Sequence, residues 1–379
     1  MPLVLNEEQE MLRDAARGFL TEKAPVAALR KLRDENDATG FDRALWKEMA
    51  EMGWAGILVE EQFGGSDFGF VGAGVIAEEM GRNLTASPFV STSILAATAL
   101  QKFAGDAQKQ EHLPKISAGD LVVSLAVDES NKHGPAKTAL AAEKSGNGFK
   151  LSGDKTFVAD GHVADKVIVA ARTGGAAGEE KGITLFLVDA KANGIETERT
   201  SMVDSRNAAR MRFDGVDATG DDVIGEVDGG YAALEGVLAA GRAGLSAEMS
   251  GAAQAAFTMT TDYLKERKQF GIEIGTFQAL QHRAAHLYSE IELVKSVVLK
   301  ALQDLDNAFG MAGVTCSLAK AKAGEVAKLA ALEAVQMHGG IGMTDEYDIG
   351  FYLKRIRVAQ EMFGDTAFHA DRIARMRGY

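Results

Sequence analysis

Hydrophobic residues along this chain follow two different periods. Near the N-terminus they recur at helical spacing, as at Met11, Ala15 and Phe19, and Asn6 with Gln9 three residues later is typical of a helix cap. In the middle of the chain the period is close to two, which predicts strands separated by Gly and Asp. Toward the C-terminus the helical period returns in long segments that are rich in alanine and other small residues.

These changes predict three domains and a mainly α protein with a central β domain. The predicted domains are an N-terminal helical domain (1–119), a small antiparallel β-barrel-like domain (120–228) and a C-terminal helical bundle (229–379). In the bundle, a long alanine-rich helix is followed by three predicted helices at 275–306, 312–337 and 360–375, so we expect four helices. The middle domain lacks the GxGxxG turn and the intervening helices of a doubly wound nucleotide fold.

Composition and charge limit the classes of binding partner that we expect for this protein. The 379 residues carry a net charge of -13 without a long basic block, which argues against nucleic acid and acidic membrane surfaces as partners. We see no signal peptide at the N-terminus and no apolar run near the roughly 20 residues of a membrane helix. One cysteine, Cys316, occurs among small and apolar residues. We therefore expect a buried thiol in a cytoplasmic protein.

Two motifs in the predicted bundle carry candidate chemistry. The stretch "YLKERKQFG" (Tyr263–Gly271) ends a helix with four consecutive charges, and "GTFQ" follows it closely. A basic helix end favours an anion, although a solvated charged turn explains this stretch equally well. In "QMHGGIGMTDEYDIGFYLKR" (Gln336–Arg355), paired glycines end a helix and expose backbone N–H groups suited to a pyrophosphate, but an ordinary helix end has the same pattern.

Together, in this domain order, the two motifs resemble the acyl-CoA dehydrogenase family. The resemblance extends over nearly the whole chain and includes "LNEEQEMLRD", "EEQFGGSDFGF" and "GDKTFVADGHVADKVIVAAR". It implies one FAD per active site, an acyl-CoA thioester substrate, electron transfer to an electron-transferring flavoprotein, and a homo- or heterotetramer. It also implies that Arg267 grips the pyrophosphate of a neighbouring subunit's FAD. The other residues that it places at this cofactor are Gln269, Phe270, Gln278, Gln336, Gly339 and Gly340.

The catalytic positions of the family are altered here. Its members remove the α-proton of the thioester with a glutamate base, and a hydride leaves the β-carbon for the flavin. The resemblance places Phe363 at the usual glutamate position and Gly241, before Arg242, at the alternative one. Neither side chain accepts a proton. The nearby carboxylates are Glu361, Asp365 and Glu248, of which Asp365 is the first candidate for a shifted base.

The residues that the resemblance places beside the flavin ring also depart from the family pattern. The usual "TEPxAGSD" loop reads "AVDESNKHGPAKT", and Ala159 lacks the hydroxyl that commonly meets the flavin ring. The absence of these flavin-ring motifs is what the resemblance implies for one subunit of a heteromeric enzyme. Some bacterial members of the family that act on steroid side chains or dicarboxylic acyl chains are built in this way. Three hypotheses stay open: an acyl-CoA dehydrogenase subunit, a catalytically silent partner of a paralogue that bears the glutamate, and a flavin oxidase or reductase that uses Asp365.

Other features are weaker. His282 and His286 have metal-ligand spacing, but the residues between them are Arg-Ala-Ala, so we expect no metal. Met249, Met259 and Met343 are most simply interpreted as core residues.

Overall fold

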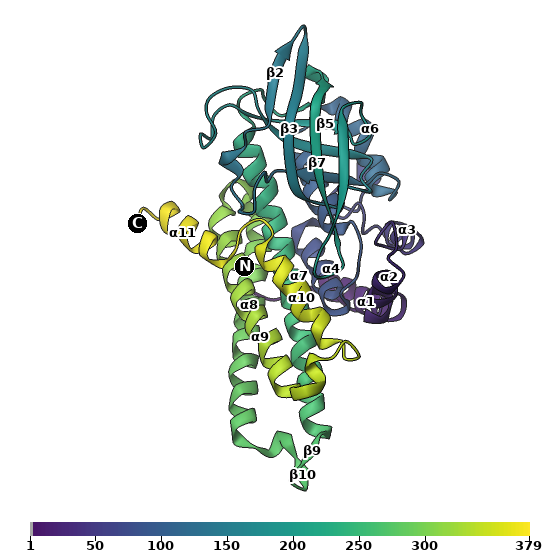
Figure 1. The fold of residues 1–379 in the computed structure, drawn as a ribbon, viewed down its shortest axis with the longest axis vertical. Helices are drawn as coiled ribbons and strands as arrows, with labels where there is room; N and C mark the ends of the chain where they lie inside the picture. Colours follow the sequence, from purple (N-terminus) through teal and green to yellow (C-terminus); the bar gives the residue numbers. More distant parts are fainter. Residues whose placement is uncertain (1–2) are drawn as a thin grey trace. The chain divides into compact units, whose positions relative to one another are not determined.

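The computed structural model describes residues 3–379 (Figure 1). The helices are α1 (Glu7–Lys23), α2 (Val26–Asp34), α3 (Arg43–Glu51), α4 (Gly69–Asn83), α5 (Ala97–Phe103), α6 (Asp106–Ser117), α7 (Gly230–Glu266), α8 (Gln278–Ala308), α9 (Gly313–His338), α10 (Ile349–Glu361) and α11 (Thr366–Met376). The strands are β1 (Val123–Ala126), β2 (Ala141–Ser145), β3 (Gly148–Ala159), β4 (Lys166–Arg172), β5 (Ile183–Asp189), β6 (Ile195–Ser201), β7 (Asn207–Ala218), β8 (Val223–Ile224), β9 (Lys268–Gln269) and β10 (Ile272–Glu273).

The chain divides into two compact units, and neither is one continuous stretch. The first unit combines the chain up to Asp34 with Gly74–Thr85 and Arg242–Tyr379. The second combines Glu35–Ala73 with Ala86–Gly241. Helices α4 and α7 therefore contribute residues to both units. The division into three consecutive domains stays a prediction.

The predicted helical bundle is confirmed in the first unit. Helix α8 runs along α9, and both α10 and α11 pack against α9. Glycines allow α4 and α7 to approach closely: a Cβ atom on Gly81 would overlap the backbone of Glu248, and one on Gly251 would overlap Glu78. The small residues of α7 thus serve close packing, as the sequence indicated. The predicted cap of α1 is also present, with Asn6 and Gln9 exchanging side-chain-to-backbone hydrogen bonds of 2.8 and 3.0 Å.

The predicted helix over 360–375 is confirmed from Thr366 onward, but its predicted start is wrong, and α10 was not predicted. Helix α10 ends at Glu361, and α11 begins at Thr366. Between them Phe363 and Gly364 have φ angles of 56° and 105°, a left-handed backbone that ends a helix. The break lies at the position where the family resemblance places the catalytic turn.

The second unit contains the predicted β domain. Its sheet has the strand order β6-β7-β3-β2-β4-β5-β8, and β1 pairs with β4. Most neighbours are antiparallel, as expected, while β4 runs parallel to β1 and β2. Alternate side chains such as Leu151, Phe186 and Phe213 meet in one apolar core. The sequence analysis missed β6, whose residues "IETERTS" are largely polar and not buried.

Candidate functional site

A two-residue hairpin follows the basic end of α7. Strands β9 and β10 pair through Gln269 and Ile272, and the turn residues Phe270 and Gly271 have φ angles of 54° and 82°. Two consecutive positive φ angles match the type I′ turns of tight hairpins, in which a phenylalanine is unfavourable. Phe270 is nevertheless 91% exposed and so gains no burial within the chain. A strained and exposed aromatic residue indicates a role in contacts outside the chain.

Arg267 connects α7 to this hairpin. Its backbone N–H donates to the carbonyl of Tyr263 at 2.8 Å, and its own carbonyl accepts from Ile274 N–H at 2.8 Å. These bonds fix the backbone, whereas the side chain is exposed and has no ion pair or hydrogen bond among residues 3–379. The guanidinium is therefore available for an anion.

The second motif lies at the end of α9. Gln336 is exposed on the last turn, and the helix ends at His338. Gly339 has a φ of 64°, and a Cβ atom on Gly339 or Gly340 would meet nothing within 4 Å. Open space therefore adjoins these two glycines, although Gly339 N–H already donates to the Gln336 carbonyl oxygen, and their role in binding stays a prediction.

Aromatic stacking joins the two motifs. The rings of Tyr263 and His338 lie 4.5 Å apart between centroids, and Tyr347 contacts both, at 6.4 Å from Tyr263 and 4.7 Å from His338. Burial lowers the pKa of His338, while its Nδ1 lies 2.7 Å from the Ala334 carbonyl oxygen. The buried Nε2 has no hydrogen-bond partner in the described chain.

The donors gathered here fit the diphosphate half of FAD. A free guanidinium and exposed amides on Gln278 and Gln336 offer charged and neutral donors to phosphate oxygens, and the glycines leave open space next to Gln336. Gln269 is committed only to the backbone oxygen of Lys268, at 2.8 Å. The buried acceptor of His338 lies beside these donors. All seven residues predicted to bind the cofactor are exposed, which leaves them accessible to a cofactor shared with another subunit.

The turn at the expected catalytic position is held by buried basic side chains. The carbonyl oxygen of Phe363 lies 3.2 Å from Arg242 Nε and 3.1 Å from His369 Nε2. Lys320, which is 1% exposed, donates from Nζ to the carbonyls of Gln360 and Gly364 at 2.9 and 3.0 Å. Burial lowers the pKa of Lys320 to about 7, and the nearby Arg242 acts in the same direction. This turn is therefore rich in donors.

The three nearby carboxylates already have structural partners. Glu248 is buried and forms a two-bond ion pair with Arg355, at 2.6 and 2.9 Å. Glu361 pairs with Arg357 at 2.9 Å on the surface. Asp365 caps α11 by accepting from Phe368 N–H at 2.8 Å. Asp365 as the first candidate base stays a prediction.

In the β domain, the loop that departs from the family pattern is held by hydrogen bonds and an ion pair of its own residue Glu129. Glu129 accepts from Ala139 and Leu140 N–H groups at 2.9 Å each and from the buried Lys155 at 2.7 Å. Burial lowers the pKa of Lys155, which the Glu129 carboxylate opposes. Ala159 ends β3, half-buried. The polar groups of this loop are thus used to fold it.

The other residues named in the sequence analysis have no unusual environment, and one prediction about them is wrong. Cys316 is buried, as predicted, and burial raises the pKa of its thiol to about 12. His282 and His286 are exposed on α8, and residues 3–379 contain no cluster of three side chains suited to a metal ion.

Met343 was predicted to be a core residue, which is wrong: it is 78% exposed beside the paired glycines, because the chain has left helix α9 there. Within residues 3–379, no helix is both long and apolar enough to cross a membrane.

The sequence analysis missed several residues of the site. Tyr263 stands one helical turn before Arg267, and this spacing could have indicated it. Lys320 interrupts a helix face of small residues, which was also a usable signal. Nothing in the local sequence linked Arg242 to Phe363.

The fold, with exposed polar groups at one end of its helical bundle, is compatible with a FAD-dependent oxidoreductase. Family models match consecutive parts of the chain: "Acyl-CoA dehydrogenase, N-terminal domain" at residues 6–120, "middle domain" at 129–216 and "C-terminal domain" at 228–377. The chain belongs to the acyl-CoA dehydrogenase family.

Individual relatives are similar to this chain over nearly its full length and nearly their own. The 3-(aryl)acrylate reductase of Clostridium sporogenes is 30% identical and covers 94% of each chain. The crystal structure of an acyl-CoA dehydrogenase from Geobacillus kaustophilus is 29% identical over 99% of each chain, with a TM-score of 0.89. A variant of the Tcur3481–Tcur3483 steroid ACAD is 30% identical over 98% of each chain, with a TM-score of 0.87.

Proposed function

We propose that this chain is the subunit of a heteromeric acyl-CoA dehydrogenase that completes the FAD site of a glutamate-bearing partner. In such an enzyme a base takes the α-proton of the acyl thioester. When bound, FAD accepts the hydride that leaves the β-carbon. The observation that carries the proposal is an asymmetry. The side chains of Arg267 and Gln336 are exposed and have no polar partner among residues 3–379, whereas the family resemblance places Phe363 and Gly241 at the usual positions of the base.

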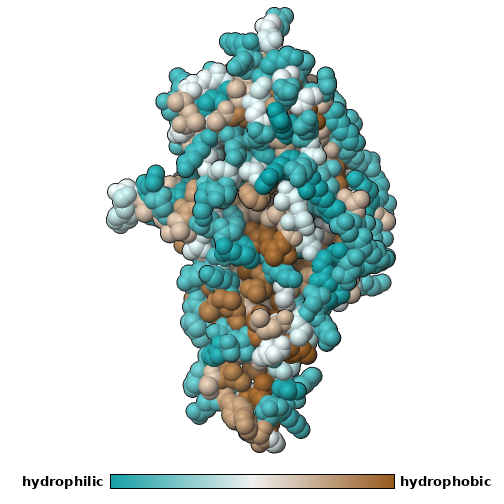
Figure 2. Space-filling view, viewed as in Figure 1, coloured by the Kyte–Doolittle hydropathy of each residue, from teal (hydrophilic) through white to brown (hydrophobic). Residues whose placement is uncertain are grey.

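Two further features support an association of subunits. Figure 2 shows apolar side chains gathered over the bundle and down to the β9–β10 hairpin. Large exposed apolar residues of the bundle include Phe270, Leu293, Leu332 and Met343, at 91%, 54%, 49% and 78% exposure. Exposed apolar surface of this kind marks interaction sites. Among similar structures, the Tcur3481–Tcur3483 steroid ACAD carries two chain names.

The assembly that we propose is a tetramer with acyl-CoA as substrate. An electron-transferring flavoprotein would then reoxidise the enzyme, and the cytoplasm is the location that suits the free thiol of Cys316. A second candidate is a flavin-dependent reductase, which the name of the Clostridium sporogenes relative favours. A reductase would consume an unsaturated acid or thioester.

The test is to purify the chain alone and with a glutamate-bearing paralogue, then to measure bound FAD and acyl-CoA-dependent reduction of an artificial electron acceptor. We expect little FAD and little turnover for the isolated chain, with both appearing in the mixed complex. About one FAD per isolated chain, with turnover at ordinary family rates, would contradict the proposal.

Arg267→Ala tests the cofactor assignment in the mixed complex. Loss of a charge-assisted contact of about 1.5–3 kcal/mol should lower the flavin absorbance that survives gel filtration. Arg377→Ala, which removes an equally exposed arginine near the C-terminus, is the matched control and should retain FAD. Equal flavin content in the two variants would remove Arg267 from the site.

A further inference from the structure

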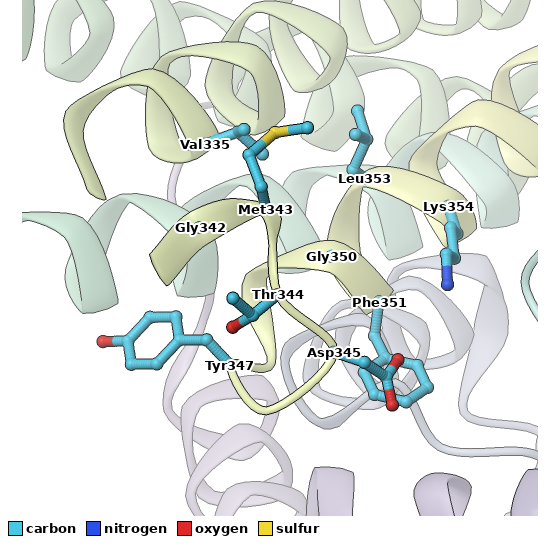
Figure 3. A pocket seen from close by; sticks show the side chains of 10 residues that line it. All are labelled: Val335, Gly342, Met343, Thr344, Asp345, Tyr347, Gly350, Phe351, Leu353 and Lys354. Carbon is cyan, nitrogen blue, oxygen red and sulfur yellow. The ribbon is translucent and has the colours of Figure 1, made fainter. Parts of the chain in front are cut away.

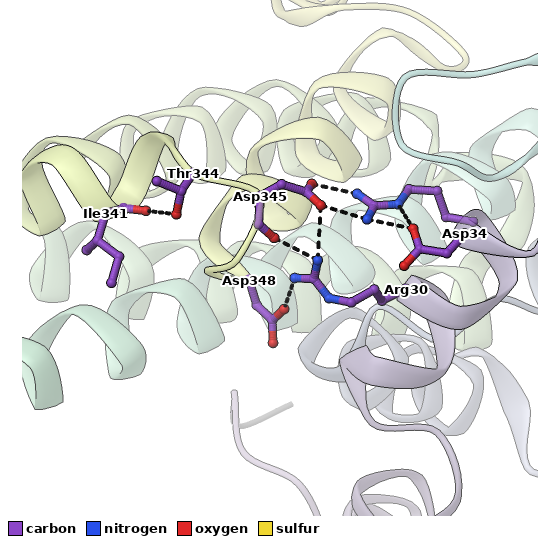
Figure 4. A network of polar contacts seen from close by, with 7 residues as sticks. Arg30, Asp34, Ile341, Thr344, Asp345 and Asp348 are labelled. Carbon is purple, nitrogen blue, oxygen red and sulfur yellow. Dashed lines mark hydrogen bonds and ion pairs between the residues drawn. The ribbon is translucent and has the colours of Figure 1, made fainter.

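The loop Gly339–Asp348, which follows the paired glycines, is anchored at its far end by two arginines of α2. Arg33 pairs with both carboxylate oxygens of Asp345, at 2.6 and 2.7 Å. Arg30 reaches the Asp345 carbonyl oxygen at 2.6 Å and the Asp348 carboxylate at 2.7 Å. Figure 4 shows these contacts converging on the loop from one side. The network therefore fixes both backbone and side chains of the loop.

An aromatic ring holds the arginines in place. The guanidinium carbons of Arg30 and Arg33 both lie 4.7 Å from the ring centroid of Phe351, on the first turns of α10. Lys354 approaches the same ring, at 5.7 Å. Guanidinium groups that stack on an aromatic face lose less freedom when they also bind a carboxylate. Arg33 holds the pKa of Asp345 at about 2, so the carboxylate is charged at any physiological pH.

The near end of the loop is fixed by packing. A Cβ atom on Gly342 would lie 2.8 Å from the Val335 carbonyl oxygen, so the loop lies directly against the last turns of α9. A cavity of about 220 Å³ separates the rest of the loop from α10 (Figure 3). Its lining includes Val335, Met343, Tyr347 and Leu353. Apart from the stacking of Tyr347 on Tyr263 and His338, the part of the loop that borders this cavity has little packing to define its shape, so its end anchors become decisive.

We propose that Arg30 and Arg33 are positioning residues for FAD: through Asp345 and Asp348 they hold the Gly339–Asp348 loop in the shape that presents Gly339 and Gly340 to the cofactor. The inference rests on the FAD site proposed above. The arginines themselves need not touch the cofactor. Their contribution is to reduce the ordering that FAD binding would otherwise require.

Asp345→Asn tests this role in the complex that binds FAD. We expect the dissociation constant for FAD, measured by flavin fluorescence, to rise about 3- to 10-fold, with faster hydrogen exchange at residues 339–348 in the FAD-free protein. Asp345→Glu retains the charge and should recover most of the affinity. The matched control is Asp120→Asn, because the Lys47–Asp120 pair is similarly exposed, with aspartate side chains 61% exposed at Asp120 and 60% at Asp345.

The outcomes separate the two proposals when Arg267→Ala is measured in parallel. If Arg267→Ala weakens FAD binding and Asp345→Asn does not, the anchoring role is wrong and the FAD site stands. If neither variant changes FAD affinity, the site itself is wrong. A rise in the dissociation constant with unchanged thermal stability supports anchoring. A rise that merely follows a lower melting temperature, without recovery in Asp345→Glu, contradicts it.

Discussion

Tyr263 and His338 stack at 4.5 Å between ring centroids, with 31° between the ring planes. Tyr263 lies one turn before Arg267 on α7, and His338 is the last residue of α9, directly before the paired glycines. One aromatic contact thus joins the end of α7, just before Arg267, to the end of α9, just before the paired glycines. Since both rings are part of packed helices, we expect the backbone of the two predicted FAD-binding motifs to be positioned before a cofactor binds.

Phe270→Asn should separate folding from binding. Asparagine before glycine is the preferred sequence of a type I′ turn, so the variant should have a melting temperature equal to or above that of the natural chain. Loss of the exposed ring should nevertheless lower FAD retention in the complex. Thermal unfolding and flavin absorbance after gel filtration measure the two effects. Full FAD retention would show that the strained Phe270 turn has no role at this site.

Lys320→Met should change the pH dependence of stability. The folded pKa of Lys320 is lowered to about 7, below the 10.5 of the unfolded chain, so the unfolded state binds more protons between these values. Stability from this site therefore rises as pH increases from about 7 to 10.5 and is least below pH 7, by an amount on the order of a few kcal/mol.

The measurement compares melting temperatures of the natural chain and Lys320→Met at pH 6.5, 8 and 9.5. The melting temperature of the natural chain should rise relative to that of the variant as pH increases, because the neutral amine of Lys320 keeps its bonds to Gln360 and Gly364. Lys328→Met, on the exposed side of the same helix, is the control and should run parallel to the natural chain. A constant difference for Lys320→Met would contradict the lowered pKa.

Glu248→Gln should destabilise the bundle. It leaves the buried Arg355 without its charged partner, which typically costs about 3–5 kcal/mol of the free energy of unfolding. Glu361→Gln breaks the exposed pair with Arg357 and should cost less than about 1 kcal/mol. Denaturant titration of both variants checks the contrast. Equal stabilities would mean that the buried pair contributes no more than a surface pair.

Asp365→Asn tests the remaining candidate base without disturbing the fold. Asparagine caps a helix about as well as aspartate, so α11 and its bond to Phe368 should persist. We expect low acyl-CoA turnover by the isolated natural chain and the same low turnover in the variant, because general-base catalysis of about 10²–10⁴-fold is missing in both. High turnover that disappears in Asp365→Asn would identify Asp365 as the base.

The sequence by itself determined the elements and their order. Helical periodicity and the cap of Asn6 with Gln9 predicted α1, and the long alanine-rich segments predicted α7, α8 and α9. Strand alternation predicted most of the sheet but missed β6, because its exposed polar residues carry no apolar signal. The family resemblance supplied the predicted FAD residues, from Arg267 to Gly340, and the prediction that the usual base is missing.

Only the tertiary structure decided how charged groups are used. Sequence spacing cannot show that Glu248 is buried against Arg355, that Lys320 binds the carbonyls around Phe363, or that Arg33 meets Asp345. Each of these contacts joins residues that are at least 40 positions apart along the chain. The reason is physical: the cost of burying a charge, and the partner that offsets it, depend on which elements pack together, whereas periodicity reports only which face of an element is apolar.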